Sequence, residues 1–276
     1  MKPALESRLP GFGTTIFTVM SQLAQKHGAI NLSQGFPDFE GPQLMRDRAI
    51  WHMNHGHNQY SPLAGIPGLL QSISNKVNAL YDYQPDPASN ICVTPGATEA
   101  LSTAISVLVH PGDEVLILDP AYDCYDPCVR LNRGVPVHVP MTVDFRPDWE
   151  RIESSVTGRT RLLIVNSPHN PSGTVWHQDD IDALRQLLAR HPLYVLSDEV
   201  YEHIVFDECE HLSLLRFPDI RERAVVVTSF GKTYHATGWR MGYAIAPDEI
   251  MSEFLRTHQF TNFSANAPLQ YALADV

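Results

Sequence analysis

A single lysine, Lys232, follows a run of β-branched residues in the last fifth of the chain. Residues 224–228 have the composition of a buried strand. Ser229, Phe230 and Gly231 end that run immediately before the lysine, and Arg240 follows shortly after it. A strand end that presents a hydroxyl group, an amine and a guanidinium group in sequence is suited to holding an anionic ligand. The stretch from 225 to 243 is therefore the first candidate for chemistry.

Small or polar residues also follow each of the other predicted strands. Short apolar runs predict strands at residues 91–93, 115–118, 162–166 and 193–196. The residues that follow them, in chain order, are the glycine turn Gly96-Ala97-Thr98, then Tyr122, then Asn170, then Asp198 and Tyr201. A glycine turn that opens a helix leaves backbone N–H groups free to bind a phosphate. A carboxylate, an amide and two phenols are thus available beside the lysine.

Helical patterns alternate with these strands. Apolar residues at helical spacing predict helices at 14–27, from Leu69 to Leu80, from Leu101 to Leu108 and at 178–190. This alternation predicts an α/β fold with three layers (αβα) and a mainly parallel, mixed sheet. In such sheets ligands bind beyond the carboxyl ends of the strands, which is where the candidate residues lie.

The composition excludes several other classes of protein. The chain has 20 Lys and Arg against 31 Asp and Glu, a net charge of −11, which disfavours a nucleic-acid surface. No run approaches the roughly 18 apolar residues of a membrane span, and the N-terminus has no signal-peptide pattern. We therefore expect a cytoplasmic protein with reduced thiols, since its four cysteines lack zinc-type spacing.

A histidine-rich stretch contains His52, His55 and His57. No cysteine or acidic ligand shares their spacing, so we expect solvated loop histidines there and no metal site. Each candidate site residue also has an ordinary structural role when taken alone. Asp198 would suit a helix N-cap, Asn170 a turn, and Arg240 a surface ion pair. Their joint occurrence at successive strand ends is what favours a site.

Pyridoxal phosphate is the cofactor whose chemistry needs this whole set. Its aldehyde forms a Schiff base with a lysine amine, and its ring nitrogen needs a carboxylate partner. Its phosphate favours backbone N–H groups, hydroxyls and arginine, and its ring favours a stacked aromatic side chain. The glycine fingerprint of a dinucleotide fold, GxGxxG, is absent from the turn after residue 94.

Several motifs resemble those of class I aminotransferases of pyridoxal-phosphate fold type I. These are NSPHNPSG at 166–173, SDEVY at 197–201 and SFGKTYHATGWRMGY at 229–243. NLSQGFPDFEGP at 31–42 and the Tyr60…Gly65 pattern are similar to the kynurenine and methionine aminotransferase branch of that family. The resemblance extends through nearly the whole chain.

The resemblance implies a role for each matching residue. Lys232 would bond to the cofactor aldehyde, and Asp198 would pair with the ring nitrogen. Asn170 and Tyr201 would hydrogen-bond the ring oxygen, and Tyr122 would stack on the ring. The phosphate would be held by Gly96, Ala97, Thr98, Ser229 and Arg240, and by Tyr60 from the neighbouring subunit of a homodimer. Gly35 would lie beside the substrate carboxylate, and cis peptide bonds are expected before Pro120 and Pro171.

The implied activity is transfer of an amino group from an L-amino acid, methionine or an aromatic one, to a 2-oxo acid. A β-lyase reaction on the same scaffold, and a cofactor-binding, dimerising fragment without activity, remain alternatives. The resemblance divides the chain into residues 1–40, an N-terminal arm with part of a small domain, and residues 41–276, the cofactor-binding large domain. Family members continue into a C-terminal small domain that supplies an arginine for the substrate carboxylate, and we expect this chain to end before it.

Overall fold

The computed structural model describes residues 2–35 and 38–276, which form one seven-stranded sheet with helices on both faces. In chain order the elements are α1 (Ile16–His27), α2 (Gln43–Asn54), α3 (Pro67–Tyr81), β1 (Ile91–Thr94), α4 (Ala97–Leu108), β2 (Glu114–Asp119), α5 (Tyr125–Leu131), β3 (Val135–Pro140), α6 (Trp149–Ser154), β4 (Thr160–Asn166), α7 (Gln178–Arg190), β5 (Tyr194–Asp198), η1 (Leu214–Arg216), α8 (Pro218–Arg221), β6 (Ala224–Ser229), α9 (Phe230–Thr233), η2 (Thr237–Trp239), β7 (Gly242–Ile245), α10 (Asp248–Thr261) and α11 (Ala267–Ala274).

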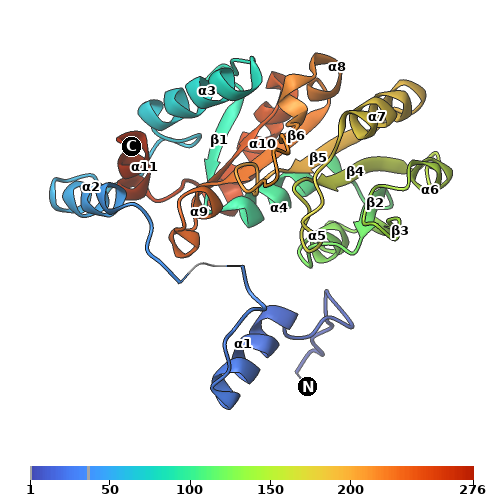
Figure 1. Cartoon of the computed structure of the whole chain (residues 1–276), viewed down its shortest axis with the longest axis horizontal. Helices are drawn as coiled ribbons and strands as arrows, with labels where there is room; N and C mark the ends of the chain where they lie inside the picture. The colour runs from blue at the N-terminus through green and yellow to red at the C-terminus, as the bar shows by residue number, and fades with distance from the viewer. Residues whose placement is uncertain (1, 36–37) are drawn as a thin grey trace.

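The strands lie in the order β1-β7-β6-β5-β4-β2-β3 (Figure 1). Strands β2 to β6 pair in parallel, whereas β7 runs antiparallel to both of its neighbours, β6 and β1. The sheet is therefore mainly parallel and mixed, and the three-layer α/β prediction is confirmed.

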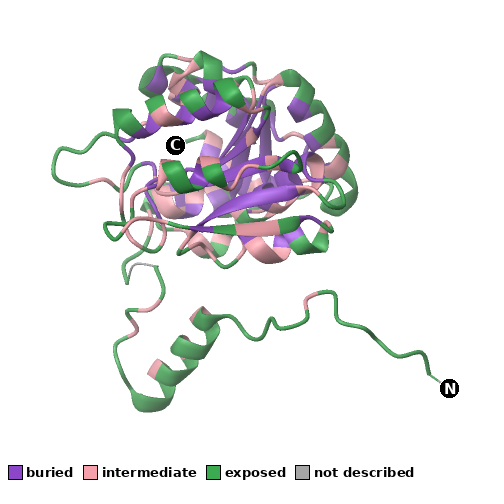
Figure 2. Cartoon of the chain, turned by 90° about the vertical axis from the view of Figure 1, so that its right-hand side faces the viewer, coloured by how far each residue is buried: buried purple, intermediate pink, exposed green. Residues whose placement is uncertain are grey.

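Alternating residues of the strands pack into two separate hydrophobic cores, one on each face of the sheet. Leu116, Leu163 and Val226 belong to the core beneath α3 and α7, whereas the next residues, Ile117 and Val227, belong to the core beneath α4 and α10. Successive side chains of a strand point to opposite faces of the sheet. Apolar residues at both kinds of position therefore require helices on both faces, and Figure 2 shows the buried strands between exposed helical surfaces.

Helix α1 begins at its cap Thr15 and ends at Gly28, which takes the left-handed conformation with φ 59°. The helix predicted at 14–27 is confirmed with its end at His27, although it begins two residues later, at Ile16. None of its residues is buried, and its apolar positions, among them Ile16 and Leu23, are exposed (Figure 2). The helix lies on the N-terminal segment beside the sheet domain rather than inside its core.

The prediction of solvated loop histidines is wrong for His52, which lies in helix α2, whereas His55 is exposed just after that helix. His52 is buried and bonds to His57 and to Asp275, at 2.5 and 2.8 Å. This helix packs against α11, more than 200 residues later in the chain. The sequence around His52 alone therefore shows no reason for its burial.

Leu80, expected on the inner face of α3, is 46 % exposed.

Strand β3 was not predicted, and its composition explains why. Pro136 and Pro140 interrupt its alternating valines, and proline is found in sheets mainly at an edge. The sheet order places β3 at the edge beside β2.

Among the described residues, no helix is long and apolar enough to cross a membrane. Within the same residues, no cluster of three or more His, Cys, Asp or Glu side chains could hold a metal ion.

Candidate active site

The carboxyl ends of the strands surround one cavity of about 920 Å³. The sequence-predicted residues that line it are Gly35, Ala97, Thr98, Tyr122, Asn170, Asp198, Tyr201, Ser229, Lys232 and Arg240. They come from loops after β1, β2, β4, β5 and β6 and from the N-terminal segment. Residues spread over 200 positions of sequence thus meet at the edge of the sheet where ligands of α/β folds bind.

Lys232 lies in α9, the single helical turn that follows β6. Its Nζ donates a hydrogen bond of 3.0 Å to the carbonyl oxygen of Gly35 and lies 5.4 Å from the centre of the Tyr201 ring. Burial lowers the pKa of Lys232, and the positive charge of Arg240 lowers it further, against an opposing effect of Asp198. This lysine is therefore more easily deprotonated than a surface lysine.

Asp198 is the last residue of β5 and is 3 % exposed. Its Oδ2 accepts a 2.7 Å hydrogen bond from the hydroxyl of Tyr125, and its Oδ1 accepts one of 3.2 Å from the backbone N–H of Val200. Burial raises the pKa of Asp198 to about 6, although both hydrogen bonds oppose that rise. A carboxylate held in this way can pair with a positive charge placed in the cavity.

Tyr125 was missed by the sequence analysis. It begins α5, a helix of seven residues that contains Pro127 and shows little periodicity. The ring is 3 % exposed and lies edge-on to the ring of Tyr122, at 5.7 Å. The only sequence signal was its position three residues after Tyr122, which does not indicate a contact with β5.

Asn166 is a second residue that was missed, and it braces the loop that carries Asn170. Its side chain accepts a hydrogen bond from the backbone N–H of Asn170 at 2.7 Å and donates one to the carbonyl oxygen of Asp198 at 2.8 Å. Asn166 and Asp198 are partners in the register of β4 and β5. The strand pairing therefore fixes the position of Asn170 relative to Asp198.

Gly96 forms the turn between β1 and α4 with φ 83°, a conformation that favours glycine. A Cβ atom at this position would lie 2.6 Å from Nη2 of Arg240. The guanidinium group in turn lies 3.4 Å from Oγ1 of Thr98. No side chain caps the start of α4, so its first N–H groups and Arg240 together form a cradle for an anion.

Gly242, the first residue of β7, lets that cradle close. A Cβ atom there would lie 2.8 Å from the backbone nitrogen of Ala97 and 2.9 Å from the carbonyl carbon of Gly96. Ser229 lies at the opposite side, where its Oγ accepts a hydrogen bond from the N–H of Gly231 at 3.1 Å. Burial raises the pKa values of Tyr122 and Tyr201, so both phenols keep their protons.

Tyr60 does not line this cavity. It is 84 % exposed and packs edge-on against Phe263 at 5.2 Å, beside a different hollow near the start of α11. The expected cis peptide bonds before Pro120 and Pro171 are confirmed, and a third lies before Pro168.

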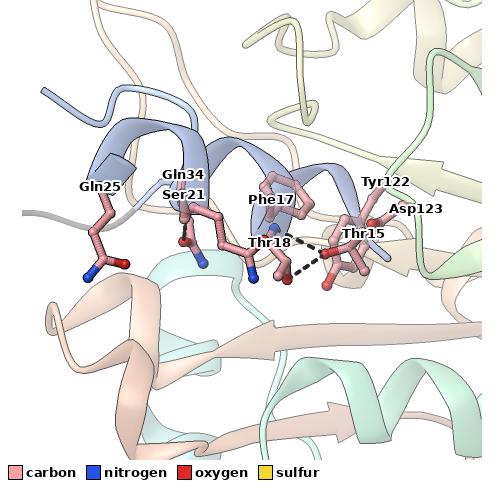
Figure 3. A pocket seen from close by; sticks show the side chains of 9 residues that line it. Thr15, Phe17, Thr18, Ser21, Gln25, Gln34, Tyr122 and Asp123 are labelled. Carbon is pink, nitrogen blue, oxygen red and sulfur yellow. Dashed lines mark hydrogen bonds between the residues drawn. The ribbon is translucent and has the colours of Figure 1, made fainter. Parts of the chain in front are cut away.

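Helix α1 forms the outer wall of the cavity. Ile16 and Phe17 line the main cavity together with Leu32, and a shallower cavity of about 450 Å³ continues along the same helix. Figure 3 shows this second cavity, in which Tyr122 and Asp123 lie beside Thr15 at the start of α1, and Ser21 and Gln25 lie farther along the helix. The part of the wall formed by Ile16, Phe17 and Leu32 is thus apolar, whereas the second cavity is lined mainly by polar side chains.

Comparisons with known proteins agree with this arrangement. A family model described as aminotransferase class I and II matches residues 27–276. Methionine aminotransferase of Escherichia coli is 53 % identical over 272 residues, which cover 98 % of this chain and 70 % of the relative. A probable N-succinyldiaminopimelate aminotransferase of Mycobacterium tuberculosis is 40 % identical over 97 % of this chain and 68 % of its own length.

Solved structures give the same result. A methionine aminotransferase structure from Escherichia coli superposes with a TM-score of 0.95 at 51 % identity, covering 99 % of this chain and 72 % of that chain. An aspartate aminotransferase from Thermus thermophilus superposes with a TM-score of 0.92 at 31 % identity, covering 99 % and 72 %. The fold and the strand-end cavity are those of a transferase that works with pyridoxal phosphate. This chain belongs to the class I and II aminotransferases, which move an amino group from an amino acid to a 2-oxo acid.

The residues around the cavity fit the cofactor of that family. The cradle at Gly96 is shaped so that a Cβ atom would fill it, and it combines unpaired helix N–H groups with a guanidinium group, the donor set for a phosphate. A lysine of lowered pKa and a buried carboxylate face the same cavity. These are the two charged groups that the aldehyde and the ring nitrogen of pyridoxal phosphate require.

Proposed function

We propose that this aminotransferase uses methionine and related apolar amino acids as donors, with Lys232 and Asp198 as its catalytic pair and Tyr201 beside them. Lys232 would hold the cofactor through its aldehyde, and Asp198 would pair with the ring nitrogen. The observation that carries the proposal is the convergence of this amine and this carboxylate in one cavity with the cradle of Arg240.

When bound, pyridoxal phosphate supplies an aldehyde that accepts the amino group and a ring that withdraws electrons from the substrate. The protein residues do the rest. The amine of Lys232 would take the proton from the substrate α-carbon, a task for which its lowered pKa suits it. Asp198 holds a proton on the ring nitrogen, because a buried carboxylate is stabilised by a positive partner.

The remaining residues position the cofactor. Ala97, Thr98, Ser229 and Arg240 hold the phosphate, and the N–H groups that follow Gly96 complete that set. Tyr122 would stack on the ring, while Asn170 and Tyr201 would donate hydrogen bonds to the ring oxygen. Asn170 also faces the substrate, whose carboxylate passes Gly35. The hydrogen bond from the backbone of Asn170 to Asn166 supports this assignment, because it holds the Asn170 loop in one position relative to the cavity.

The preference for methionine rests on the cavity wall. Ile16, Phe17 and Leu32 provide apolar surface on the side of α1, which suits a thioether or an aromatic side chain. The similarity to methionine aminotransferase of Escherichia coli supports the same donor. The acceptor is a 2-oxo acid.

We also propose that the protein acts as a cytoplasmic homodimer in which Tyr60 reaches the phosphate of the neighbouring subunit. The exposed rings of Tyr60, Phe260 and Phe263 support an apolar contact between copies. The free cysteines of the described residues suit a reducing compartment. Residues 41–276 would act as the cofactor-binding domain, and residues 1–40 as an arm over its cavity.

A spectrum of the purified protein with added pyridoxal phosphate, followed by methionine and a 2-oxo acid, tests the proposal. We expect a cofactor absorption band that changes on addition of methionine, and the keto acid of methionine as product. Release of ammonia without an acceptor would instead indicate a lyase. Cofactor binding without any turnover would indicate a binding protein, and either result would overturn the assignment.

A further inference from the structure

Two cysteines lie against each other on the segment that supports the cofactor cavity. The Sγ atoms of Cys124 and Cys128 are 3.6 Å apart, one helical turn from each other at the start of α5. Cys128 is 8 % exposed, and Cys124 is partly exposed. The mechanism described above uses neither thiol.

We propose that Cys124 and Cys128 form an oxidisable dithiol, whose closure to a disulfide by a peroxide weakens the hold of the protein on its cofactor. A disulfide requires the sulfur atoms to approach to about 2.05 Å. The pair is already in contact, so only a local tightening of one turn is needed. The proposal goes beyond aminotransfer, and only its effect on the cofactor depends on the proposed function.

The surroundings favour thiolate chemistry at Cys128. A hydrogen bond from the Cys124 thiol lowers the pKa of Cys128, despite the opposing effect of burial. The thiolate is the nucleophilic form of cysteine. Cys128 is therefore the thiol of the pair that loses its proton more readily, and a second thiol lies directly beside it at 3.6 Å.

The chemistry balances with hydrogen peroxide as the oxidant. The Cys128 thiolate attacks one peroxide oxygen, the O–O bond breaks, and Cys128 becomes a sulfenic acid as hydroxide leaves. Sγ of Cys124 then attacks Sγ of Cys128, forming the S–S bond and breaking the S–O bond. The thiol proton leaves with the hydroxyl group as water. Two thiols and one peroxide thus give one disulfide and two waters.

The first turn of α5 can accommodate this change. Pro127 has no N–H group to donate, and the backbone bonds from Cys128 to Cys124 and from Tyr125 to Tyr122 are both long, at 3.3 Å. Few strong bonds therefore oppose a tightening of the turn.

Closure would act on the cofactor cavity through Tyr125. This residue lies between the two cysteines in sequence, and its hydroxyl donates the 2.7 Å hydrogen bond to Asp198. Tyr122, which lines the cavity, directly precedes the same turn. Pulling the turn together therefore disturbs both the carboxylate and the aromatic wall of the site.

The test uses the full chain carrying Cys209→Ser, which removes the exposed thiol. After peroxide, we expect a mass loss of about 2 Da, the two hydrogen atoms of the thiols, located by fragmentation within residues 122–131 and reversed by dithiothreitol. We also expect cofactor affinity to fall at least fivefold and to recover on reduction, with an unchanged circular dichroism spectrum.

Matched variants separate the steps. In Cys124→Ser, Cys128 should lose its resolving partner, so that dimedone traps a sulfenic acid and no mass loss appears. The proposal fails if both thiols remain open to alkylation after peroxide, or if the oxidised protein binds the cofactor as tightly as the reduced one. If neither form binds the cofactor, the proposed function fails instead, and the mass change alone decides on the dithiol.

Discussion

The amine of Lys232 donates a hydrogen bond to the backbone carbonyl of Gly35, which joins the end of β6 to the N-terminal segment. This contact closes the cavity on the side of α1. The residue proposed to react therefore also contacts the N-terminal segment beside the cavity.

Replacing Lys232 by alanine should abolish covalent attachment of the cofactor. Borohydride should fix pyridoxal phosphate to the natural chain but not to Lys232→Ala, as measured by intact mass. Amino transfer should fall by at least about 10²-fold, because the proton-transfer group is lost. Lys26→Ala, at an exposed position of α1, is the matched control and should retain both properties. Equal labelling of the two variants would contradict the assignment of Lys232.

Gly96→Ala should damage the phosphate cradle, since the new Cβ atom would lie 2.6 Å from the guanidinium nitrogen of Arg240. Gly112→Ala is a close control, because Gly112 has a similar φ of 92° but no atom within 4 Å of the added Cβ. Both changes should cost about 1 kcal/mol of stability through backbone strain. Only Gly96→Ala should weaken cofactor binding, by about tenfold or more, in a fluorescence titration. Similar losses in both variants would point to general strain.

The charge of Asp198 should destabilise the cofactor-free protein at neutral pH. Burial raises the pKa of Asp198 from 3.8 to about 6, so the folded state binds the proton more tightly than the unfolded state. The stability that this group contributes is complete below pH 3.8 and is lost as the pH rises through 6. Asp198→Asn should therefore increase the unfolding free energy at pH 8 by up to about 3 kcal/mol. At pH 4 the two proteins should be similar.

Urea unfolding at the two pH values measures that difference. The same variant should bind pyridoxal phosphate more weakly, because the ring nitrogen loses its charged partner. If the variant is less stable than the natural chain at pH 8, the hydrogen bonds accepted by Asp198 outweigh the cost of burying its charge, and the prediction is wrong.

Tyr125→Phe should move the pH dependence of cofactor binding. The change keeps the buried ring but removes the hydrogen bond to Asp198, so the pKa of that carboxyl group should rise above its present value of about 6. Loss of a hydrogen bond to a charged group costs about 1.5–3 kcal/mol. As the pH is lowered, Asp198 should become protonated earlier in the variant. Cofactor affinity should therefore begin to decline at a higher pH than in the natural chain. Tyr83→Phe, whose ring lies under Arg221, should leave the profile unchanged.

The strand ends could be predicted from the sequence because their signals are local. The run of valines before Ser229 and the glycine turn at Gly96 each specify an element and its end within a few residues. The parallel order of the strands then brings the following residues to one edge. The predicted residues from Ala97 to Arg240 share the cavity for that reason, whereas Gly35 reaches it from the N-terminal segment and Tyr60 lies outside it.

The supporting contacts could not be predicted because they depend on pairings across the chain. Asn166 braces Asn170 only because β4 and β5 align it with Asp198. Tyr125 reaches Asp198 from a short helix that has no clear periodicity. His52 is buried because α11 covers α2. In each case the partner lies more than 30 residues away, beyond any local pattern.

The position of β1 at the edge of the sheet has a consequence for hydrogen exchange. Its strand partner is β7, with Thr94 opposite Gly242, and the two halves of the phosphate cradle continue from this pairing. Peeling of an edge strand is a low-energy opening in many sheets. A bound phosphate would fasten both strands at once and so oppose that opening. The cofactor should therefore slow amide exchange along β1 and β7 most strongly. It would stabilise the pairing of these two strands in addition to taking part in the reaction.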